Sequence, residues 1–413
     1  EPSGNASKVG QLMKGTGVIG LDKDVGQDQK EWLKISFDNG KEETVGWIVA
    51  EYTVKDRTEL LDEQYRKLDY SPQEKIDEYP DNPRVKVKGI YLTIYSASGS
   101  RLDSLIEMAK RTDINAFVID VKDDNGRMLF PTKTAERIAA KANEKAPIKD
   151  INALMKKLKD NGIYTIARIV TFKDPIYTEI YPDKAIIDKR TGKPHTNNDG
   201  LRWTSPYDRQ LWEYDVGVAK EAAEVGFNEI QFDYVRFPAS NGGKLDSVLD
   251  YRNTQNETKP QVIQDFLKYA YKELSPYHVY IGADVYGLVG SVVDDMGIGQ
   301  YWEAISNVVD YICPMMYPSH YANHTYGLPV PDAYPYETVY HSTRDSVMRN
   351  GNIETPAIIR PWIQDFTASW VKGHIKYGEA EVRAQIKALE ENGIDEFMLW
   401  NPNNRYTESA VTD

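Results

Sequence analysis

The sequence contains little cysteine and no surplus of positive charge, and both shortages limit what the protein can do. Only one cysteine, Cys313, occurs in 413 residues, so neither an internal disulfide nor a cysteine-based metal site can form. Because Cys313 stands in an apolar run, we expect it to be a small core residue. The 50 Lys and Arg are outnumbered by 63 Asp and Glu, for a formal net charge of −13. Clustered basic side chains bind nucleic acids and anionic membranes, so we expect neither as a partner.

Long hydrophobic runs and several common functional motifs are also absent. The longest apolar stretches, such as residues 311–317, are far shorter than the roughly 18 residues of a membrane-spanning helix. No Gly-x-Ser-x-Gly elbow occurs, and His320 and His324 lack the glutamate of a metalloprotease motif. Residues 120–126 do not fit the register of a calcium-binding loop. We therefore expect no membrane span, no metal site and no cofactor.

The first part of the chain has the pattern of a small β domain followed by a linker. Short β-type runs at residues 17–20, 32–37 and 46–49 flank the turn Asp38-Asn39-Gly40, which predicts an all-β domain over residues 1–54. Residues 55–84 are charged and rich in proline at their end. They predict a linker with one amphipathic helix over residues 58–68.

From residue 85 to 413, apolar strands alternate with amphipathic helices. Eight strands are predicted, at 87–96, 116–122, 164–171, 229–236, 279–285, 311–317, 357–363 and 396–401. Helices are predicted between them, at 102–111, 151–161, 208–225, 262–274 and 380–392. This alternation favours an α/β fold, the (β/α)8 TIM barrel, with long loops after the third and fourth strands. A doubly wound sheet is the alternative, but no Gly-rich phosphate turn follows the first strand.

Charged residues lie at or near the ends of the predicted strands, where barrel enzymes place their active sites. A strand alternates its side chains between two faces. If the polar faces point into the mouth of the barrel, three aspartates converge with two arginines and one lysine: Asp120, Asp233, Asp284, Arg168, Arg360 and Lys122. Paired carboxylates are the machinery of glycoside hydrolysis, in which one protonates the leaving oxygen and the other attacks the sugar or activates water.

The predicted cleft is also rich in aromatic residues that could stack on sugar rings. The chain has 8 Trp and 28 Tyr, many for this length, and several lie at strand ends or in the long loops. We expect the substrate-binding residues to be Asp120, Lys122, Arg168, Tyr234, Arg236, Tyr317, His320, Arg360, Trp362 and Trp400, and Trp203 and Tyr286 are further aromatic candidates. A lyase or deacetylase is an alternative that would depend on His320 with Tyr317.

The heptapeptide Phe-Asp-Tyr-Val-Arg-Phe-Pro at 232–238 resembles the signature of a bacterial family of sequence-defined glycoside hydrolases with a TIM barrel. The similarity extends over residues 85–405, through Gly89-Ile90-Tyr91, residues 120–123 and Trp400-Asn401-Pro402. The resemblance implies that Asp233 is the nucleophile of a retaining barrel glycosidase. Asp284 stands where such enzymes usually carry a glutamate acid/base, and Asp120 or Asp365 are the alternatives for that role.

The N-terminal residues resemble a bacterial SH3-type module, through Trp32-Leu33-Lys34-Ile35 and the closing phrase Gly46-Trp47-Ile48. The resemblance implies attachment to peptidoglycan and a location outside the bacterial cell or in its envelope. Our leading hypothesis is a glycoside hydrolase acting on a polysaccharide, with Arg236 or Arg168 keeping one carboxylate ionised. The alternative is a non-catalytic carbohydrate-binding or wall-anchoring protein, which the aspartate on the fifth strand favours.

Overall fold

The computed structural model describes residues 2–10, 12, 15–38, 43–240 and 243–412. Its internal contacts divide the chain into two compact units, Glu1–Leu68 and Asp69–Asp413. The predicted linker, residues 55–84, is therefore shared between the two units. In the described residues, no helix combines the length and the apolar character needed to cross a membrane.

The N-terminal unit is built on a three-stranded antiparallel sheet. Its strands are β1 Ile19–Val25, β2 Glu31–Asp38 and β3 Glu43–Val49, in the order β1-β2-β3. Asn39 and Gly40 of the predicted turn lie outside the described residues. The single helix expected over residues 58–68 is instead two short helices, η2 Arg57–Leu60 and α1 Glu63–Arg66. Asp62 between them has extended backbone angles, φ −64° and ψ 156°, which interrupt a continuous helix.

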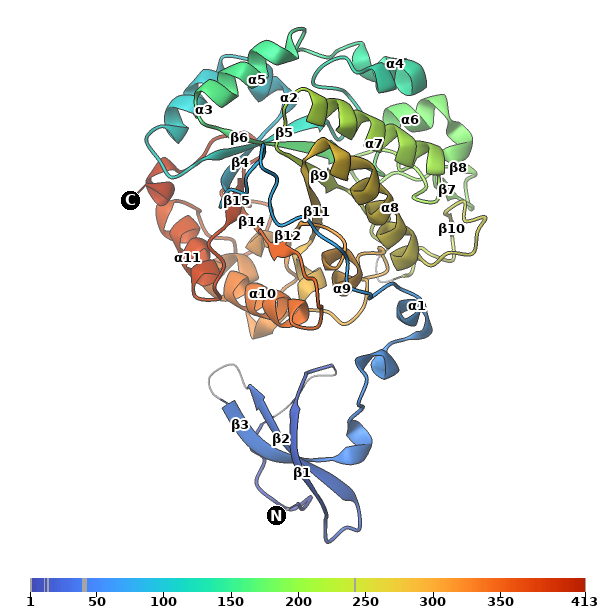
Figure 1. Cartoon of the computed structure of the whole chain (residues 1–413), viewed down its shortest axis with the longest axis vertical. Coiled ribbons are helices and arrows are strands. Elements are labelled where there is room, and N and C mark those ends of the chain that lie inside the picture. Colours follow the sequence, from blue (N-terminus) through green and yellow to red (C-terminus); the bar gives the residue numbers. More distant parts are fainter. Residues whose placement is uncertain (1, 11, 13–14, 39–42, 241–242, 413) are drawn as a thin grey trace. The chain divides into compact units, whose positions relative to one another are not determined.

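The second unit is a closed barrel of parallel strands, as predicted (Figure 1). The strands are β4 Lys88–Leu92, β5 Ala116–Lys122, β6 Tyr164–Val170, β9 Glu229–Asp233, β11 Tyr280–Tyr286, β12 Tyr311–Met315, β13 Ile358–Ile359, β14 Trp362–Gln364 and β15 Phe397–Trp400. Short strands β13 and β14 together form the seventh position, because Arg360-Pro361 separates them and proline cannot donate to the ladder. Pairing of β11 with β12 and of β15 with β4 closes the ring.

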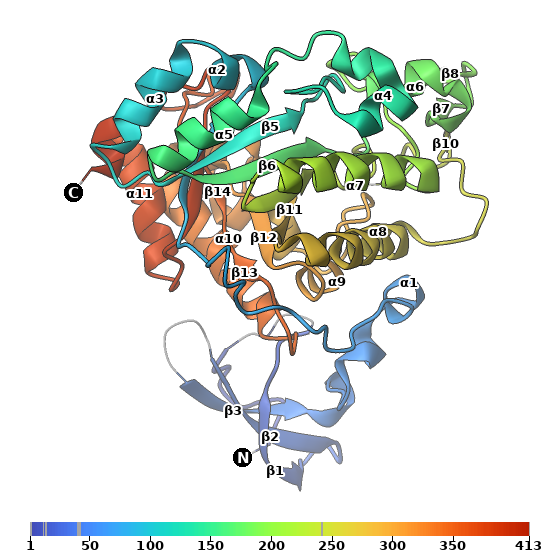
Figure 2. The same cartoon turned by 45° about the horizontal axis from the view of Figure 1, so that its top comes forward.

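Helices surround the ring of strands, as Figures 1 and 2 both show. They are α2 Ile94–Ser98, α3 Arg101–Ala109, α4 Lys133–Ala139, α5 Ile151–Asp160, α6 Pro175–Ile180, α7 Arg209–Glu224, α8 Lys259–Leu274, α9 Trp302–Ser306, α10 Pro335–Asn350 and α11 Glu379–Glu390. Each predicted helix is present, with ends shifted by up to three residues. A large apolar core lies between the strands and the helices.

A second, smaller core fills the inside of the barrel. It is rich in tyrosine and contains the buried Cys313, which confirms the prediction for this residue. At the end where the strands begin, the buried Arg360 pairs with Glu229 at 2.7 Å and with Glu396 at 2.7 Å. The inside of the barrel is therefore a packed core, and barrel enzymes carry their sites at the other end, where the strands finish.

The two long loops, after β6 and β9, meet in a small antiparallel sheet. It consists of β7 Ile187–Asp188, β8 Lys193–Pro194 and β10 Leu249–Asp250, in the order β10-β7-β8. β7 and β8 belong to the first loop and β10 to the second, so the pairing of Leu249 with Asp188 links the two loops. These loops leave the carboxyl ends of their strands, the end where barrel enzymes carry their sites.

Candidate active site

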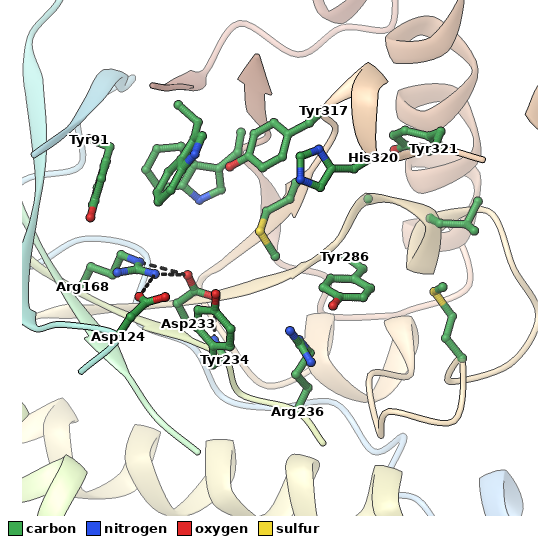
Figure 3. A pocket seen from close by; sticks show the side chains of 16 residues that line it. Tyr91, Asp124, Arg168, Asp233, Tyr234, Arg236, Tyr286, Tyr317, His320 and Tyr321 are labelled. Atoms are coloured by element: carbon green, nitrogen blue, oxygen red, sulfur yellow. Dashed lines mark hydrogen bonds and ion pairs between the residues drawn. The ribbon is translucent and has the colours of Figure 1, made fainter. Parts of the chain in front are cut away.

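A cavity of about 540 Å³ lies at the carboxyl ends of the barrel strands (Figure 3). It is lined by Tyr91, Asp124, Arg168, Asp233, Tyr234, Arg236, Tyr286, Gly287, Leu288, Met296, Met315, Tyr317, His320, Tyr321, Trp362 and Trp400. Seven strands contribute, namely β4, β6, β9, β11, β12, β14 and β15, and Asp124 comes from the loop after β5. The site is thus assembled from the whole circumference of the barrel.

Arg168 on β6 is the centre of the charged part of the cavity. Its guanidinium donates to Asp233 Oδ2 from Nε at 2.9 Å and from Nη2 at 2.6 Å. It also donates to Asp120 at 2.6 Å and to Asp124 at 3.1 Å. Three carboxylates therefore share one buried cation, and the ion pairs offset part of the cost of burying them.

Asp233 is the last residue of β9 and faces the cavity. While Arg168 holds its Oδ2, its Oδ1 accepts the backbone N–H of Tyr234 at 2.5 Å. The bonds from the guanidinium are charge-assisted and fix the orientation of the carboxyl group. Asp233 is therefore held in one position facing the cavity.

Asp284 on β11 has the opposite environment. It is 1% exposed, and its Oδ1 accepts the indole N–H of Trp362 at 2.8 Å. Its Oδ2 has no hydrogen-bond partner among the described residues. Burial, and then the negative charge of Asp233, raise the pKa of Asp284 well above its usual value. Asp284 therefore holds its proton more tightly than an exposed aspartate does, and it lies behind Trp362, which lines the cavity.

Asp120 and Asp365, the alternatives for the acid/base, lie in different surroundings, and Asp124 is a further carboxylate near Asp120. Burial raises the pKa of Asp120 to about 7, although Arg168 and the Tyr91 hydroxyl favour its ionised form. Burial would also raise the pKa of Asp124, but the charges of Arg168 and Lys173 outweigh it and lower that pKa. Asp365 lies outside the cavity, where it accepts from the Thr407 backbone N–H at 2.7 Å and hydroxyl at 2.6 Å. Its contacts position the chain after β15.

The structure does not bring Lys122 to the cavity. A bulge in β5 shifts the register, so that Asp120 pairs with Arg168 but Lys122 pairs with Ile169. The bulge turns Lys122 to the outside of the barrel, where it is buried and pairs with Asp174 at 2.8 Å and Asp215 at 2.5 Å. Lys122 was predicted to bind substrate. The structure instead places it between the strand and the helices, where its ion pairs have a structural role.

Arg360 is the second predicted ligand that lies away from the cavity. Its partners are Glu229, the first residue of β9, and Glu396, which precedes β15. It also stacks on Tyr311, with 3.5 Å between its central carbon and the ring centroid. Arg360 thus closes the opposite end of the barrel, and its predicted convergence with the aspartates is wrong.

Aromatic side chains form one wall of the cavity, and most of them were predicted. Trp400 stacks on Tyr91 with ring centroids 4.1 Å apart and meets the edge of Trp362 at 5.6 Å. Tyr317 lies beside His320, whose pKa is lowered by burial, so the imidazole is neutral. Trp203 is buried behind Tyr234 and does not line the cavity.

Asp124, Tyr321 and Met296 were not predicted as site residues, because they come from loops whose course has no periodic signal. Tyr91 follows the usual alternation on β4 and could have been found from it. Within the described ranges, no group of three or more His, Cys, Asp or Glu side chains is arranged to hold a metal ion.

Comparison with known proteins agrees with this architecture. No curated protein matches the chain by sequence. A hypothetical protein from Ruminiclostridium thermocellum is 33% identical, covering 51% of this chain and 98% of that one, with a TM-score of 0.42. The glycoside hydrolase domain of PgaB (BpsB) from Bordetella bronchiseptica is 13% identical, with a TM-score of 0.54 over 80% of this chain and 99% of that one. The second likeness shows the shared barrel fold.

A family match covers most of the barrel. Residues 89–406 match the family described as "Putative glycosyl hydrolase domain", and this range contains every residue that lines the cavity. The chain therefore belongs to this family of glycosyl hydrolases, and its function is glycosidase-like.

Proposed function

We propose that the cavity hydrolyses the glycosidic bonds of a polysaccharide, with Asp233 as the anionic carboxylate and Asp284 as the proton donor. The observation that supports this is the contrast between the two environments. Asp233 accepts hydrogen bonds from Arg168 and a backbone N–H, whereas Asp284 is buried with one oxygen unpaired. A carboxyl group bound to an arginine can serve as base or nucleophile, and a buried carboxyl group with a raised pKa can serve as acid.

The remaining parts of the cavity suit this reaction. Asp233 would attack or electrostatically stabilise the anomeric carbon, and the neutral Asp284 would give its proton to the leaving oxygen. Trp400 and Tyr91 offer flat faces for a pyranose ring. The volume of about 540 Å³ falls within the range of small-ligand sites and would hold a few sugar units of a longer chain.

An Asp284→Asn variant tests the assignment of the proton donor. We expect hydrolysis of a natural polysaccharide to fall by roughly 10²–10⁴-fold, the usual contribution of a general acid. An aryl glycoside with a good leaving group, such as a dinitrophenolate, needs little protonation, so its cleavage should fall far less. Reducing-end release and dinitrophenol absorbance measure the two reactions.

Asp120→Asn and the exposed Asp183→Asn are the matched controls for this test. If Asp120→Asn shows the selective loss and Asp284→Asn does not, the proton donor is Asp120. If wild-type protein cleaves neither class across a broad panel of glycans, the hydrolase itself is refuted.

A second candidate function is non-catalytic carbohydrate binding. One observation favours it: Asp284 and Asp120 do not line the cavity, whereas Tyr91, Trp362 and Trp400 do. A binding protein needs only the aromatic wall. Glycan binding that is unchanged in Asp233→Asn, with no cleavage by wild type, would establish this alternative.

The protonation of Asp284 also predicts a pH dependence of stability. An unfolded aspartate ionises near pH 3.9, whereas burial and Asp233 raise the pKa of Asp284 in the folded protein. Between these two values the folded state holds a proton that the unfolded state has lost, so the free energy of unfolding falls as pH rises. Each pH unit of rise in this window lowers the free energy of unfolding by about 1.4 kcal/mol.

Urea unfolding of the barrel at pH 5 and pH 7 measures this effect. The wild type should lose more stability than Asp284→Asn between the two values. The variant retains an oxygen for the Trp362 indole, so the comparison isolates the proton. Equal losses in both proteins would show that Asp284 is ionised in the folded state.

The substrate class and location are also part of the proposal. We infer an extracellular or cell-envelope glycan, with attachment to peptidoglycan through the N-terminal unit. The support is the resemblance of this unit to a bacterial SH3-type module, together with its observed three-stranded antiparallel sheet.

A further inference from the structure

Arg236 is a buried cation for which the described part of the protein provides no carboxylate. It is 5% exposed and lines the cavity. Its Nη1 donates a hydrogen bond to the Phe237 carbonyl at 2.8 Å. Arg168, by contrast, is shared by three carboxylates. Figure 3 shows Arg236 below Tyr286, apart from the group formed by Arg168, Asp124 and Asp233.

Aromatic rings hold the Arg236 guanidinium in place. Its central carbon lies 4.8 Å from the centroid of Trp203, 5.1 Å from Tyr234 and 4.5 Å from Tyr286. Cation–π contacts of this kind offset part of the cost of removing the charge from water. These contacts are not hydrogen bonds, so most of the N–H donors of the guanidinium remain for other partners. A buried arginine with unused donors is suited to an anion supplied by a ligand.

The backbone is shaped so that Arg236 and Asp233 face the same cavity. Residues three apart in an extended strand lie on opposite faces. Here β9 ends at Asp233, and Tyr234 adopts a φ of +52°, a conformation that side-chain-bearing residues rarely take. The turn brings Arg236 to the same cavity as Asp233. Strain kept at such a position is typical of functional sites.

We propose that Arg236 binds a carboxylate of the glycan, so that the substrate is an acidic polysaccharide with a uronic acid or a carboxyalkyl-substituted sugar next to the cleaved bond. A carboxylate is planar and matches the two parallel N–H groups of a guanidinium edge. A sugar bearing it could lie against the ring of Tyr286. The inference rests on the proposed function only for cleavage of the glycan, because binding of the carboxylate does not depend on hydrolysis.

The test is calorimetric binding of matched glycans to the full chain carrying Asp233→Asn, with and without Arg236→Met. The probes are oligogalacturonate and hyaluronan oligosaccharides, each with a carboxyl-reduced form in which the acid has become a primary alcohol. We expect at least one acid form to bind about 10-fold or more tightly than its reduced form. Arg236→Met should abolish this preference and leave binding of the reduced form unchanged.

Two further variants control the result. Arg236→Lys keeps the charge but loses the planar fork, so it should restore only part of the preference. Arg209→Met removes another arginine that stacks on a tryptophan, Trp212, and pairs with Glu257 outside the cavity, and it should change nothing. If Arg236→Met does not fold, the comparison of acid and reduced forms on the wild type, at low and high salt, still tests whether the protein prefers a carboxylate.

Several outcomes would overturn the inference. These are equal binding of acid and reduced forms, no binding of any acidic probe at millimolar concentration, and preference for a sulfated neutral glycan over every carboxylate. Cleavage of a neutral glycan that Arg236→Met does not slow would refute this inference while supporting the proposed hydrolase. Binding of an acid form that depends on Arg236, with no cleavage of any glycan, would support the inference and refute the hydrolase.

Discussion

Replacement of Asp233 by asparagine should lower glycan hydrolysis by at least about 10³-fold, which corresponds to about 4 kcal/mol of transition-state stabilisation. Asparagine keeps the size of the side chain and an oxygen for the Tyr234 N–H, but it has no negative charge. The positive charge that develops at the anomeric carbon would then lose its counterion or its nucleophile. Initial rates of reducing-end release, with products followed by mass spectrometry, measure the loss.

The matched control is Asp124→Asn, which also lines the cavity and also loses a bond to Arg168. If the loss arises from a disturbed Arg168, both variants should be equally impaired. If it arises from the carboxylate itself, Asp233→Asn should be impaired far more. Activity of Asp233→Asn within 10-fold of wild type would show that Asp233 does not take part in catalysis. An Asp233→Ala variant that is rescued by azide, with a glycosyl azide as product, would identify Asp233 as a nucleophile.

The barrel could be predicted because its signal is local and repeated eight times. Apolar runs such as residues 116–122 and 164–170 are buried on both faces in the structure, and the helices between them are amphipathic. Asp233 and Arg168 could be placed together because both follow the usual alternation of a strand. The turn between β2 and β3 stays a prediction, since it falls outside the described residues.

The errors at Lys122 and Arg360 have one physical origin, since strand periodicity does not say where a strand is interrupted. A bulge in β5 sends Lys122 to the outer face, although it stands two residues after Asp120. In the seventh strand position, Arg360 lies at the end of the barrel where the strands begin, and Trp362, two residues on, lies at the cavity. Depth along the barrel depends on the stagger between strands, which a single sequence does not encode.

Among these substitutions, replacement of Arg360 should lower the free energy of unfolding the most. Arg360→Met would leave Glu229 and Glu396 buried without their shared cation, next to one another inside the barrel. Removing one partner of a buried ion pair typically costs about 3–5 kcal/mol. Because this cluster lies at the end of the barrel away from the cavity, the folded fraction should retain its glycan binding. Urea unfolding at pH 7, followed by tryptophan fluorescence, measures the change.

The cost should come from the uncompensated carboxylates more than from lost packing, because methionine fills much of the volume of arginine. The double variant Arg360→Met with Glu229→Gln should therefore be more stable than Arg360→Met alone, which a double-mutant cycle will show. The exposed pair of Arg383 with Glu379, four residues apart on α11, is the control. Arg383→Met should lower the free energy of unfolding far less than Arg360→Met, because solvent screens an exposed ion pair. A loss at Arg360 as small as that at Arg383, or no recovery in the double variant, would contradict the assignment of this ion cluster as a structural element of the barrel.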